Sequence, residues 1–522
     1  MNISRMRAMG NGSLRFPGPT ATMNRPIRTF ALAIAPLAIA VAGCTSPAPL
    51  DASSLRPPEV GPPTIEVIVL AGDDLSVLDA EITVEGASVV ETEEGVPAFV
   101  WPQGPTTIEV SAPGFVSQSE VAEDPPREDL IEFRLEPVVL SGRVSTHRGI
   151  ALPGVEVHLG EHTDTTNDDG LFEIVRAVPG EILLTRATWQ DSSVQWDGST
   201  SEVDTTMEPL VVHGVRVGGS AAGDSEHWQQ LLGMADSTAI NAFVVDVKDE
   251  FGTVYHNTTV DAALEASAVT LQYDLAEIIA DMDDHNLYKI ARIVAFQDTP
   301  MARTEPDHAV LDENGSDLWY TRNGDAWMDP TDPVSYEYPI ALADEACRAG
   351  FDEIQFDFAS FPFGGDVSTA VFDDEYTEEI RVASIQAFLK RAYLVLSPRC
   401  GVAASVLGIT LESGTDEGVG QRPGLMSRTI DVLSPMLYST NYGAGWKGYA
   451  DPNDNAEEII ESALVSGLSK LEGFAYYRPW LQTWTISAVD VRGIQRRVDE
   501  RANGWMLWSN AASYPVELLP PQ

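Results

Sequence analysis

The chain has 522 residues, of which 79 are Asp or Glu and 32 are Lys or Arg, giving a formal net charge of −47 at pH 7. This length predicts two to four domains. The acidic excess argues against nucleic acid as the main partner, because a phosphate-binding face needs clustered Lys and Arg, and it argues against docking on anionic lipid. Since the acids are spread along the chain, their simplest interpretation is a soluble, self-repelling surface.

The amino terminus has the pattern of an export signal. Two arginines precede an apolar run over residues 30–42, which has the length of a signal-peptide core and is short for a membrane span. The run ends in VAGC at residues 41–44, which resembles the lipobox of bacterial lipoproteins. The resemblance implies a lipid anchor at Cys44 and an exported protein facing the periplasm or the exterior. An ordinary secretory signal is the alternative, and Met23 would make a tidier start than Met1.

Short β-strands are expected after a tether. Residues 44–64 are rich in proline and small residues, a composition that stays extended. The next residues, to about 210, read as short strands separated by Gly, Pro and Asp, and the pattern restarts near residue 138. We therefore expect the following division: signal peptide 1–43, tether 44–64, β-sandwich 65–137, β-sandwich 138–211 and a larger domain 212–522.

Three motifs mark the second sandwich. They are LSGRV at residues 140–144, LPGVEV at 152–157 and DDGLFEI at 168–174. In this order they resemble the carboxypeptidase regulatory-like domain, a small transthyretin-like β-sandwich. The resemblance is weaker for residues 64–137, and it implies spacer or adhesion units without catalysis.

From residue 212 the candidate strands alternate with helical stretches, which is typical of βαβ units and a parallel sheet. Eight such units in about 310 residues predict a (β/α)8 TIM barrel. A doubly wound open sheet is the alternative, but no Gly-rich dinucleotide or phosphate loop supports it. The eight candidate strands are residues 214–219, 242–249, 289–297, 351–358, 401–408, 431–438, 472–477 and 504–509.

The remaining cysteines, Cys347 and Cys400, fall in a predicted helix and just before a predicted strand. Export permits a disulfide, but spacing along the chain does not fix the distance between Cα atoms. We favour two buried free thiols over a bridge. The 8 histidines are scattered and no Cys/His group has zinc spacing, so we expect neither a metal site nor a cofactor.

Chemistry in a TIM barrel sits at the carboxyl ends of the strands. In the fourth strand, alternation places Glu353, Gln355 and Asp357 on one face, with Asp357 at the carboxyl end. A carboxylate inside a strand is costly unless it is paired, hydrogen-bonded or used. In the second strand Asp246 and Lys248 share a face, and Lys248 would keep a neighbouring carboxylate ionised.

Structural interpretations compete with each of these assignments. Asp246, Lys248 and Arg292 would also form a buried network that only braces the barrel. Glu353 lies deeper and is expected to brace. For Trp327, in the loop after the third strand, sugar binding and plain packing explain the residue equally well.

The predicted rim combines carboxylates, basic groups, amides and aromatic rings, a mixture that suits carbohydrate. Two carboxyl groups flanking a glycosidic bond supply a general acid and a nucleophile or base. We predict Asp357 as nucleophile or base, and Asp246 or Glu412 as the acid. The predicted substrate-binding residues are Lys248, Asp249, Arg292, Gln355, Gln421, Tyr438, Asn441, Arg478, Trp480 and Trp508.

Seven runs over residues 212–515 follow one another in the order of a known family. They are NAFVVDVKD at 241–249, IARIVAFQD at 290–298, GFDEIQFD at 350–357 with FP at 361–362, GVGQ at 418–421, SPMLY at 434–438, RPWLQ at 478–482 and GWMLW at 504–508. These runs resemble the bacterial "putative glycosyl hydrolase" domain of unknown function, grouped with α-galactosidase-like (β/α)8 hydrolases. The resemblance implies a barrel, export and action on a polysaccharide, with Asp357 as nucleophile or base by analogy with related barrels.

Two positions depart from that family. Ser360 stands where its members usually carry Arg, and Ser405 stands where they usually carry Asp. We therefore keep three hypotheses: a monomeric, envelope-anchored glycoside hydrolase, a non-catalytic carbohydrate-binding protein on the same barrel, and a surface adhesion protein whose sandwiches bind a partner.

Overall fold

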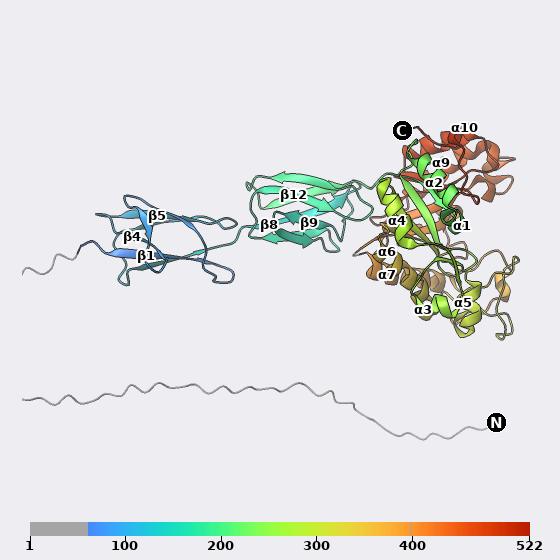
Figure 1. Cartoon of the computed structure of the whole chain (residues 1–522), viewed down its shortest axis with the longest axis horizontal. Helices are drawn as coiled ribbons and strands as arrows, with labels where there is room; N and C mark the ends of the chain where they lie inside the picture. The colour runs from blue at the N-terminus through green and yellow to red at the C-terminus, as the bar shows by residue number, and fades with distance from the viewer. Residues whose placement is uncertain (1–60, 398, 522) are drawn as a thin grey trace, which may run out of the picture. The chain divides into compact units, whose positions relative to one another are not determined.

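A computed structural model describes residues 61–521 apart from residue 398 (Figure 1). Cys44 and the predicted signal peptide fall outside these residues, so the lipid anchor stays a prediction. Within the described part of the chain, no helix is long and apolar enough to cross a membrane. The same part holds no group of three or more His, Cys, Asp or Glu side chains that could bind a metal ion.

The first described region, up to Leu135, consists of β-strands in two sheets, with orders β3-β4-β1-β7 and β2-β5-β6. Alternate residues of β1 (Thr64–Ala71) are buried, which places Ile65 and Val67 in one apolar core with Phe99. The other strands are β2 (Glu81–Val84), β3 (Val89–Glu91), β4 (Pro97–Val100), β5 (Thr106–Ser111), β6 (Gln118–Ala122) and β7 (Leu130–Leu135).

A second pair of sheets follows, with orders β10-β9-β12-β13 and β11-β8-β14. Side chains from both sheets, among them Val144, Val157, Phe172 and Ile182, share one buried core, as expected for a sandwich. The strands are β8 (Val139–Thr146), β9 (Glu156–Leu159), β10 (His162–Thr165), β11 (Leu171–Val175), β12 (Gly180–Thr185), β13 (Ser192–Trp196) and β14 (Glu202–Met207).

The remaining chain forms a closed barrel of eight parallel strand positions, which confirms the predicted fold class. Closure follows from β15, which pairs in parallel with both β25 and β16. Each predicted strand overlaps an observed one, except that the seventh is broken at Pro479, which has no N–H to donate to a ladder. The strands are β15 (Val212–Val217), β16 (Ala242–Lys248), β19 (Tyr288–Val294), β20 (Glu353–Asp357), β21 (Gly401–Leu407), β22 (Val432–Leu437), β23 (Tyr476–Tyr477) with β24 (Trp480–Gln482), and β25 (Gly504–Trp508).

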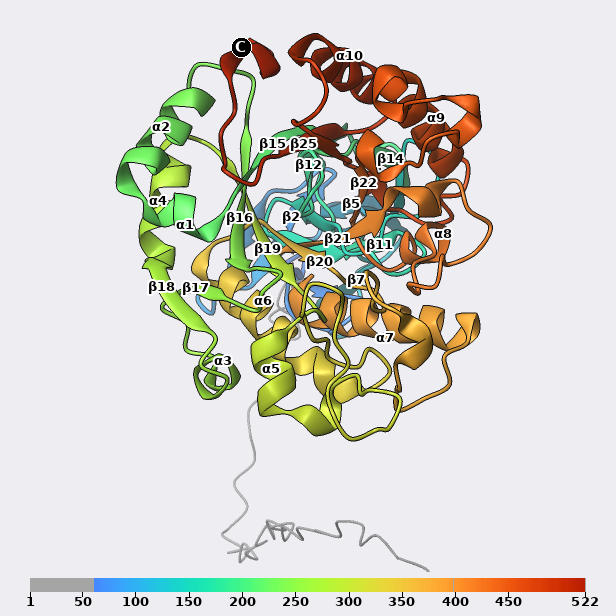
Figure 2. The same cartoon turned by 90° about the vertical axis from the view of Figure 1, so that its right-hand side faces the viewer.

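Helices surround the barrel strands (Figure 2). Several helices begin at side-chain caps of the expected type; for example, Asp274 accepts from backbone N–H groups at the start of α4, and Thr377 accepts from one at the start of α7. Two short strands, β17 (Val254–His256) and β18 (Val269–Tyr273), extend the sheet beside β16. The helices are α1 (Gly219–Gly223), α2 (Ser225–Ala235), α3 (Asp261–Glu265), α4 (Leu275–Asp284), α5 (Thr299–Thr304), α6 (Glu337–Ala349), α7 (Glu378–Leu396), α8 (Pro423–Met426), α9 (Ala456–Leu468) and α10 (Ala488–Asp499).

Cys347 and Cys400 form a disulfide, so the expectation of two free thiols is wrong. Cys347 lies in the last turn of α6, which leads into β20, and Cys400 directly precedes β21. Because β20 and β21 are neighbours in the barrel, both cysteines lie at the amino ends of adjacent strands, with their Cα atoms 5.9 Å apart. This distance follows from the closed barrel and could not be deduced from the spacing of the two cysteines along the chain.

Candidate active site

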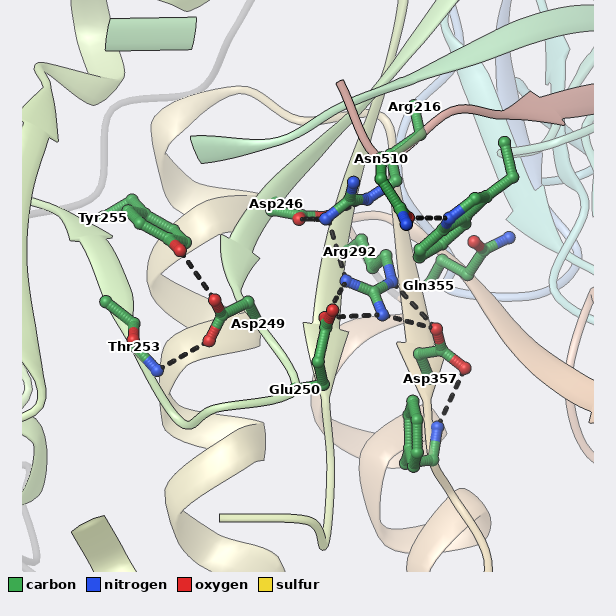
Figure 3. Close-up of polar contacts among 12 residues, drawn as sticks. Arg216, Asp246, Asp249, Glu250, Thr253, Tyr255, Arg292, Gln355, Asp357 and Asn510 are labelled. Atoms are coloured by element: carbon green, nitrogen blue, oxygen red, sulfur yellow. Dashed lines mark hydrogen bonds and ion pairs between the residues drawn. The ribbon is translucent and has the colours of Figure 1, made fainter. Parts of the chain in front are cut away.

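One arginine connects three carboxylates at the carboxyl end of the barrel (Figure 3). Arg292, on β19, donates from Nε to Asp357 Oδ2 at 2.8 Å and from Nη1 to Asp246 Oδ1 at 3.0 Å. Its contacts with Glu250 Oε2 are longer, at 3.4 Å. Burial alone would lower the pKa of Arg292, but the carboxylates outweigh it and raise that pKa well above its ordinary value. Arg292 is therefore a permanent cation in the cluster.

Asp246 is held on both oxygens. Arg216, on β15, pairs with Asp246 through two of its nitrogens, and Arg292 binds Oδ1 from the other side. The side chain of Asp246 is only 1% exposed, so this carboxylate is bound from two sides and shielded from solvent. Asp246 therefore fixes the positions of Arg216 and Arg292.

Asp357 ends β20 at a strained turn. Its Oδ1 accepts the backbone N–H of Phe358 at 3.0 Å, while Arg292 holds Oδ2. Phe358 has a φ of 49°, in the left-handed region that a bulky residue rarely adopts. Its ring stacks on Phe363 with centroids 5.4 Å apart, which helps to fix the turn. Strained backbone of this kind costs on the order of 1–3 kcal/mol and clusters at functional sites.

Glu250 is the most accessible carboxylate of the cluster, with 29% of its side chain exposed. Burial would raise its pKa, but Arg292 and Arg216 outweigh burial and hold the pKa below its ordinary value. Glu250, Asp246 and Arg216 line a cavity of about 500 Å³ together with Asn510. This volume falls within the range of small-molecule sites. The cluster is thus open to a ligand on the side of Glu250.

Lys248 does not face the interior with Asp246, contrary to the expectation from strand alternation. The pairing of β16 with β19 shifts by one residue between Asp246 and Lys248, so that Lys248 lies opposite Ile293. Its ammonium pairs with Asp298 at 2.7 Å and lies over the ring of Tyr338 on α6. The Lys248 side chain therefore lies between β16 and α6, where it compensates the charge of Asp298.

Asp249 and Gln421 each form hydrogen bonds with backbone groups of the loops around them. Asp249 accepts from the backbone N–H of Thr253 at 2.9 Å and from the Tyr255 hydroxyl at 2.6 Å, and burial raises its pKa (Figure 3). Gln421 uses its amide to join three backbone groups, those of Leu407, Ala359 and Ser405. Asp249 lines the same cavity as Glu250, whereas the Gln421 amide is committed to the protein.

The predicted aromatic site residues differ in how far their side chains are buried. Trp508 is half-buried, with the guanidinium carbons of Arg216 and Arg292 at 4.3 and 4.7 Å from its ring centroid. Trp480 is fully buried and donates its N–H to Gln355 Oε1 at 3.1 Å. Trp327 is fully buried too, so its environment is packing.

Tyr438 follows β22 and is buried; burial and the nearby charge of Asp357 raise its pKa well above the ordinary value. Asn441 is exposed, in the short turn after β22.

Two predicted site residues lie away from the cluster. Arg478 pairs with Glu353 at 2.8 Å at the amino end of the barrel, where both side chains are completely buried. Glu412 pairs with Lys447 at 2.7 Å and lines a separate hollow, which shares no residue with the cavity beside Glu250. Of the three predicted catalytic acids, the structure thus brings together Asp357 and Asp246.

Arg216 and Glu250 were missed from the sequence as site residues. A signal for Arg216 was present, because alternation in β15 places it two residues after Gly214 on the inward face beside Asp246. Glu250 follows the end of β16 in a loop, where no alternation rule applies. Only the folded structure shows that this loop returns Glu250 to Arg292.

Residues 214–514 match a family model described as "Putative glycosyl hydrolase domain". No curated protein matches the chain significantly. Among solved structures, a hypothetical protein from Ruminiclostridium thermocellum ATCC 27405 is 31% identical over 36% of this chain and 96% of its own, with a TM-score of 0.33. The spore cortex-lytic enzyme SleL from Bacillus cereus is 8% identical over 59% and 73%, with a TM-score of 0.37. The α-galactosidase TtGalA from Thermus thermophilus is 11% identical over 84% and 95%, with a TM-score of 0.38. Because the family model covers more than half of the chain, this protein belongs to the family described as "Putative glycosyl hydrolase domain".

Proposed function

We propose that the barrel hydrolyses glycosidic bonds in a polysaccharide. The observation that carries the proposal is the meeting of Asp357 and Glu250 on one guanidinium, that of Arg292, with Glu250 in the wall of a cavity of about 500 Å³. Glycoside hydrolysis requires two carboxyl groups that flank the scissile bond. The family to which the chain belongs supports the same reaction class.

Asp357 is the proposed nucleophile or base. Its two oxygens accept from Arg292 and from the backbone N–H of Phe358. The same contacts fix its direction at the carboxyl end of β20. Asp246 is a positioning residue in this scheme, because it holds Arg292 from the opposite side.

Glu250 is the proposed proton donor, in place of Asp246 or Glu412. In the free protein its charge is favoured by Arg292 and Arg216. Its 3.4 Å contacts with Arg292 are the longest in the cluster, so a sugar ring entering beside Glu250 loosens these contacts first. Loss of the ion pair and exclusion of water both raise the pKa of a carboxyl group, which gives bound Glu250 the proton that the leaving oxygen needs.

The test is a polysaccharide panel digested by wild type, Asp357→Asn and Glu250→Gln. Each variant should lose roughly 10²–10⁴-fold in rate on a substrate that wild type cleaves, the usual contribution of a general acid or base. Glu226→Gln, which changes an exposed carboxylate at the start of α2, is the matched control and should retain activity. Unchanged turnover by Asp357→Asn would overturn the assignment.

We further propose that the enzyme is anchored to the cell envelope through Cys44. The support is the lipobox-like VAGC at residues 41–44 and the proline-rich segment that follows it. Radioactive palmitate fed to expressing cells should label wild type and leave Cys44→Ala unlabelled. Equal labelling of the two proteins would refute the anchor.

The second candidate is a non-catalytic carbohydrate-binding protein. Ser360 and Ser405 are each 1% exposed, and each hydroxyl is buried without a hydrogen-bond partner where family members usually carry a charged residue. Retention on a polysaccharide without release of reducing ends after prolonged digestion would favour this candidate. Reproducible release of reducing ends would exclude it.

A further inference from the structure

A second hollow opens at the carboxyl end of the barrel. It has a volume of about 450 Å³ and is lined by Glu412, Trp446 and Lys447, with Ile409, Ser413 and Glu417 completing the wall. These residues belong to the loops that follow β21 and β22. Because β20, β21 and β22 are consecutive in the barrel, the hollow lies at the same end as Asp357.

Three polar atoms around this hollow are buried without a hydrogen-bond partner. They are Oε1 of Glu412, an acceptor, Nε1 of Trp446, a donor, and the hydroxyl of Tyr442, which can serve as both. The rings of Tyr442 and Trp446 lie 5.3 Å apart. Burial and the charge of Glu412 raise the pKa of Tyr442, which places its phenol in the field of that carboxylate. An unpartnered buried polar group is costly, so a ligand that pairs with such a group is favoured.

Lys447 fixes the carboxylate that faces the hollow. Its ammonium contacts Glu412 Oε2 at 2.7 Å and Ser462 Oγ at 2.6 Å. This pairing uses one oxygen of Glu412 and leaves the other without a partner. The ion pair also neutralises the Glu412 carboxylate, and the other acid of the wall, Glu417, accepts from the hydroxyls of Ser413 and Thr415.

The arrangement is that of a sugar site. The wall holds the half-buried indole of Trp446, a ring that can contact the C–H groups of a pyranose, together with an unpartnered acceptor of Glu412 and an unpartnered donor of Trp446. We propose that this hollow is a second saccharide-binding site, which holds a further unit of a neutral polysaccharide chain. That this chain is the one cleaved at Asp357 rests on the proposed function; binding in the hollow does not.

The test uses the full mature chain and electrophoresis through gels containing hydroxyethylcellulose, soluble starch, xylan or glycol chitin. At least one polymer should retard wild type. Trp446→Ala, Trp446→Phe and Glu412→Gln should each weaken that interaction, with about a tenfold rise in Kd for Trp446→Ala, as expected when about 1.4 kcal/mol of ring contact is lost. Tyr320→Ala, which removes an exposed aromatic ring lining neither cavity, should bind as wild type does.

The same measurements in an Asp357→Asn background separate binding from hydrolysis. Retardation that persists in Asp357→Asn and is lost on adding Trp446→Ala supports the site whether or not wild type cleaves the polymer. Where cleavage occurs, Trp446→Ala should raise KM for the polymer and leave the rate on the corresponding nitrophenyl monosaccharide unchanged. Equal binding by wild type and both folded Trp446 variants, or no retardation of wild type by any of the four polymers, would overturn the site.

Discussion

The two ends of the barrel each contain a buried arginine–carboxylate cluster, and the clusters differ in charge balance and in access. At the amino end, Arg478 pairs with a single carboxylate, that of Glu353, and both side chains are completely buried. At the carboxyl end, two arginines face three carboxylates, and one of these, Glu250, is 29% exposed beside a cavity. The comparison teaches that burial of an ion pair does not by itself indicate a functional site. The carboxyl-end cluster differs in its excess of negative charge and in a carboxylate that reaches solvent, and the proposed active site rests on these features.

The largest expected effect is on activity at the carboxyl end. Arg292→Lys retains a positive charge but cannot contact Asp246, Asp357 and Glu250 with one planar group, so we expect a loss of about 10²–10³-fold in kcat/KM. Steady-state kinetics on a polysaccharide cleaved by wild type provide the measurement. Arg478→Lys is the matched control at the amino end and should keep its activity. Full activity in Arg292→Lys would mean that the two arginine–carboxylate clusters do not differ in their role.

At the amino end the effect should be on stability. Arg478→Met leaves Glu353 buried and unpaired, which should lower the free energy of unfolding by about 3–5 kcal/mol. The double variant Arg478→Met/Glu353→Leu should recover most of that loss, because two packed apolar side chains can replace a buried pair. Urea unfolding measures both, and the activity of the folded double variant should equal that of wild type. Reduced activity would mean that the amino end contributes to the site.

The disulfide at the amino end should contribute a somewhat smaller amount. Cys347 and Cys400 are separated by 53 positions, and removal of a bridge of this kind typically costs about 2–4 kcal/mol. Cys347→Ala/Cys400→Ala should therefore unfold at lower urea concentration and keep its kcat. Coincident unfolding curves with and without reductant would contradict the expectation.

The smallest effects concern pH, and they should have opposite signs at the two ends. Glu250 has a lowered pKa, so its stabilising contribution is present above the ordinary value of 4.5 and is lost as pH falls through the lowered value. Glu353 has a raised pKa because burial outweighs Arg478, so its contribution is present below 4.5 and is lost as pH rises through the raised value. Urea unfolding of wild type, Glu250→Gln and Glu353→Gln between pH 3 and pH 6 gives the free energy of unfolding against pH. The difference between wild type and each variant gives the slope due to that glutamate. Slopes of the same sign would contradict the comparison.

Much of the fold could be predicted from the sequence, because the pattern of strands and helices is local. The alternation that places Glu353, Gln355 and Asp357 on one face is a property of β20 itself, and the structure has all three buried in the barrel. The prediction for Lys248 failed because a one-residue shift in the pairing of β16 with β19 depends on the neighbouring strand. Contacts made by loops, such as that of Glu250 with Arg292, depend on the whole fold and leave no periodic trace in the sequence.

The irregularity in β16 has an electrostatic consequence. If β16 paired with β19 without the shift, Val247 would lie opposite Ile293, and Lys248 would face the interior and add a third cation to the cluster of two arginines and three carboxylates. The cluster would then carry no net charge, whereas with the bulge it carries an excess of one negative charge. Cleavage of a glycosidic bond passes through an oxocarbenium-like, positively charged sugar. Under the proposed function, the shift in register thus leaves the cluster with the sign of charge that stabilises a cation-like transition state.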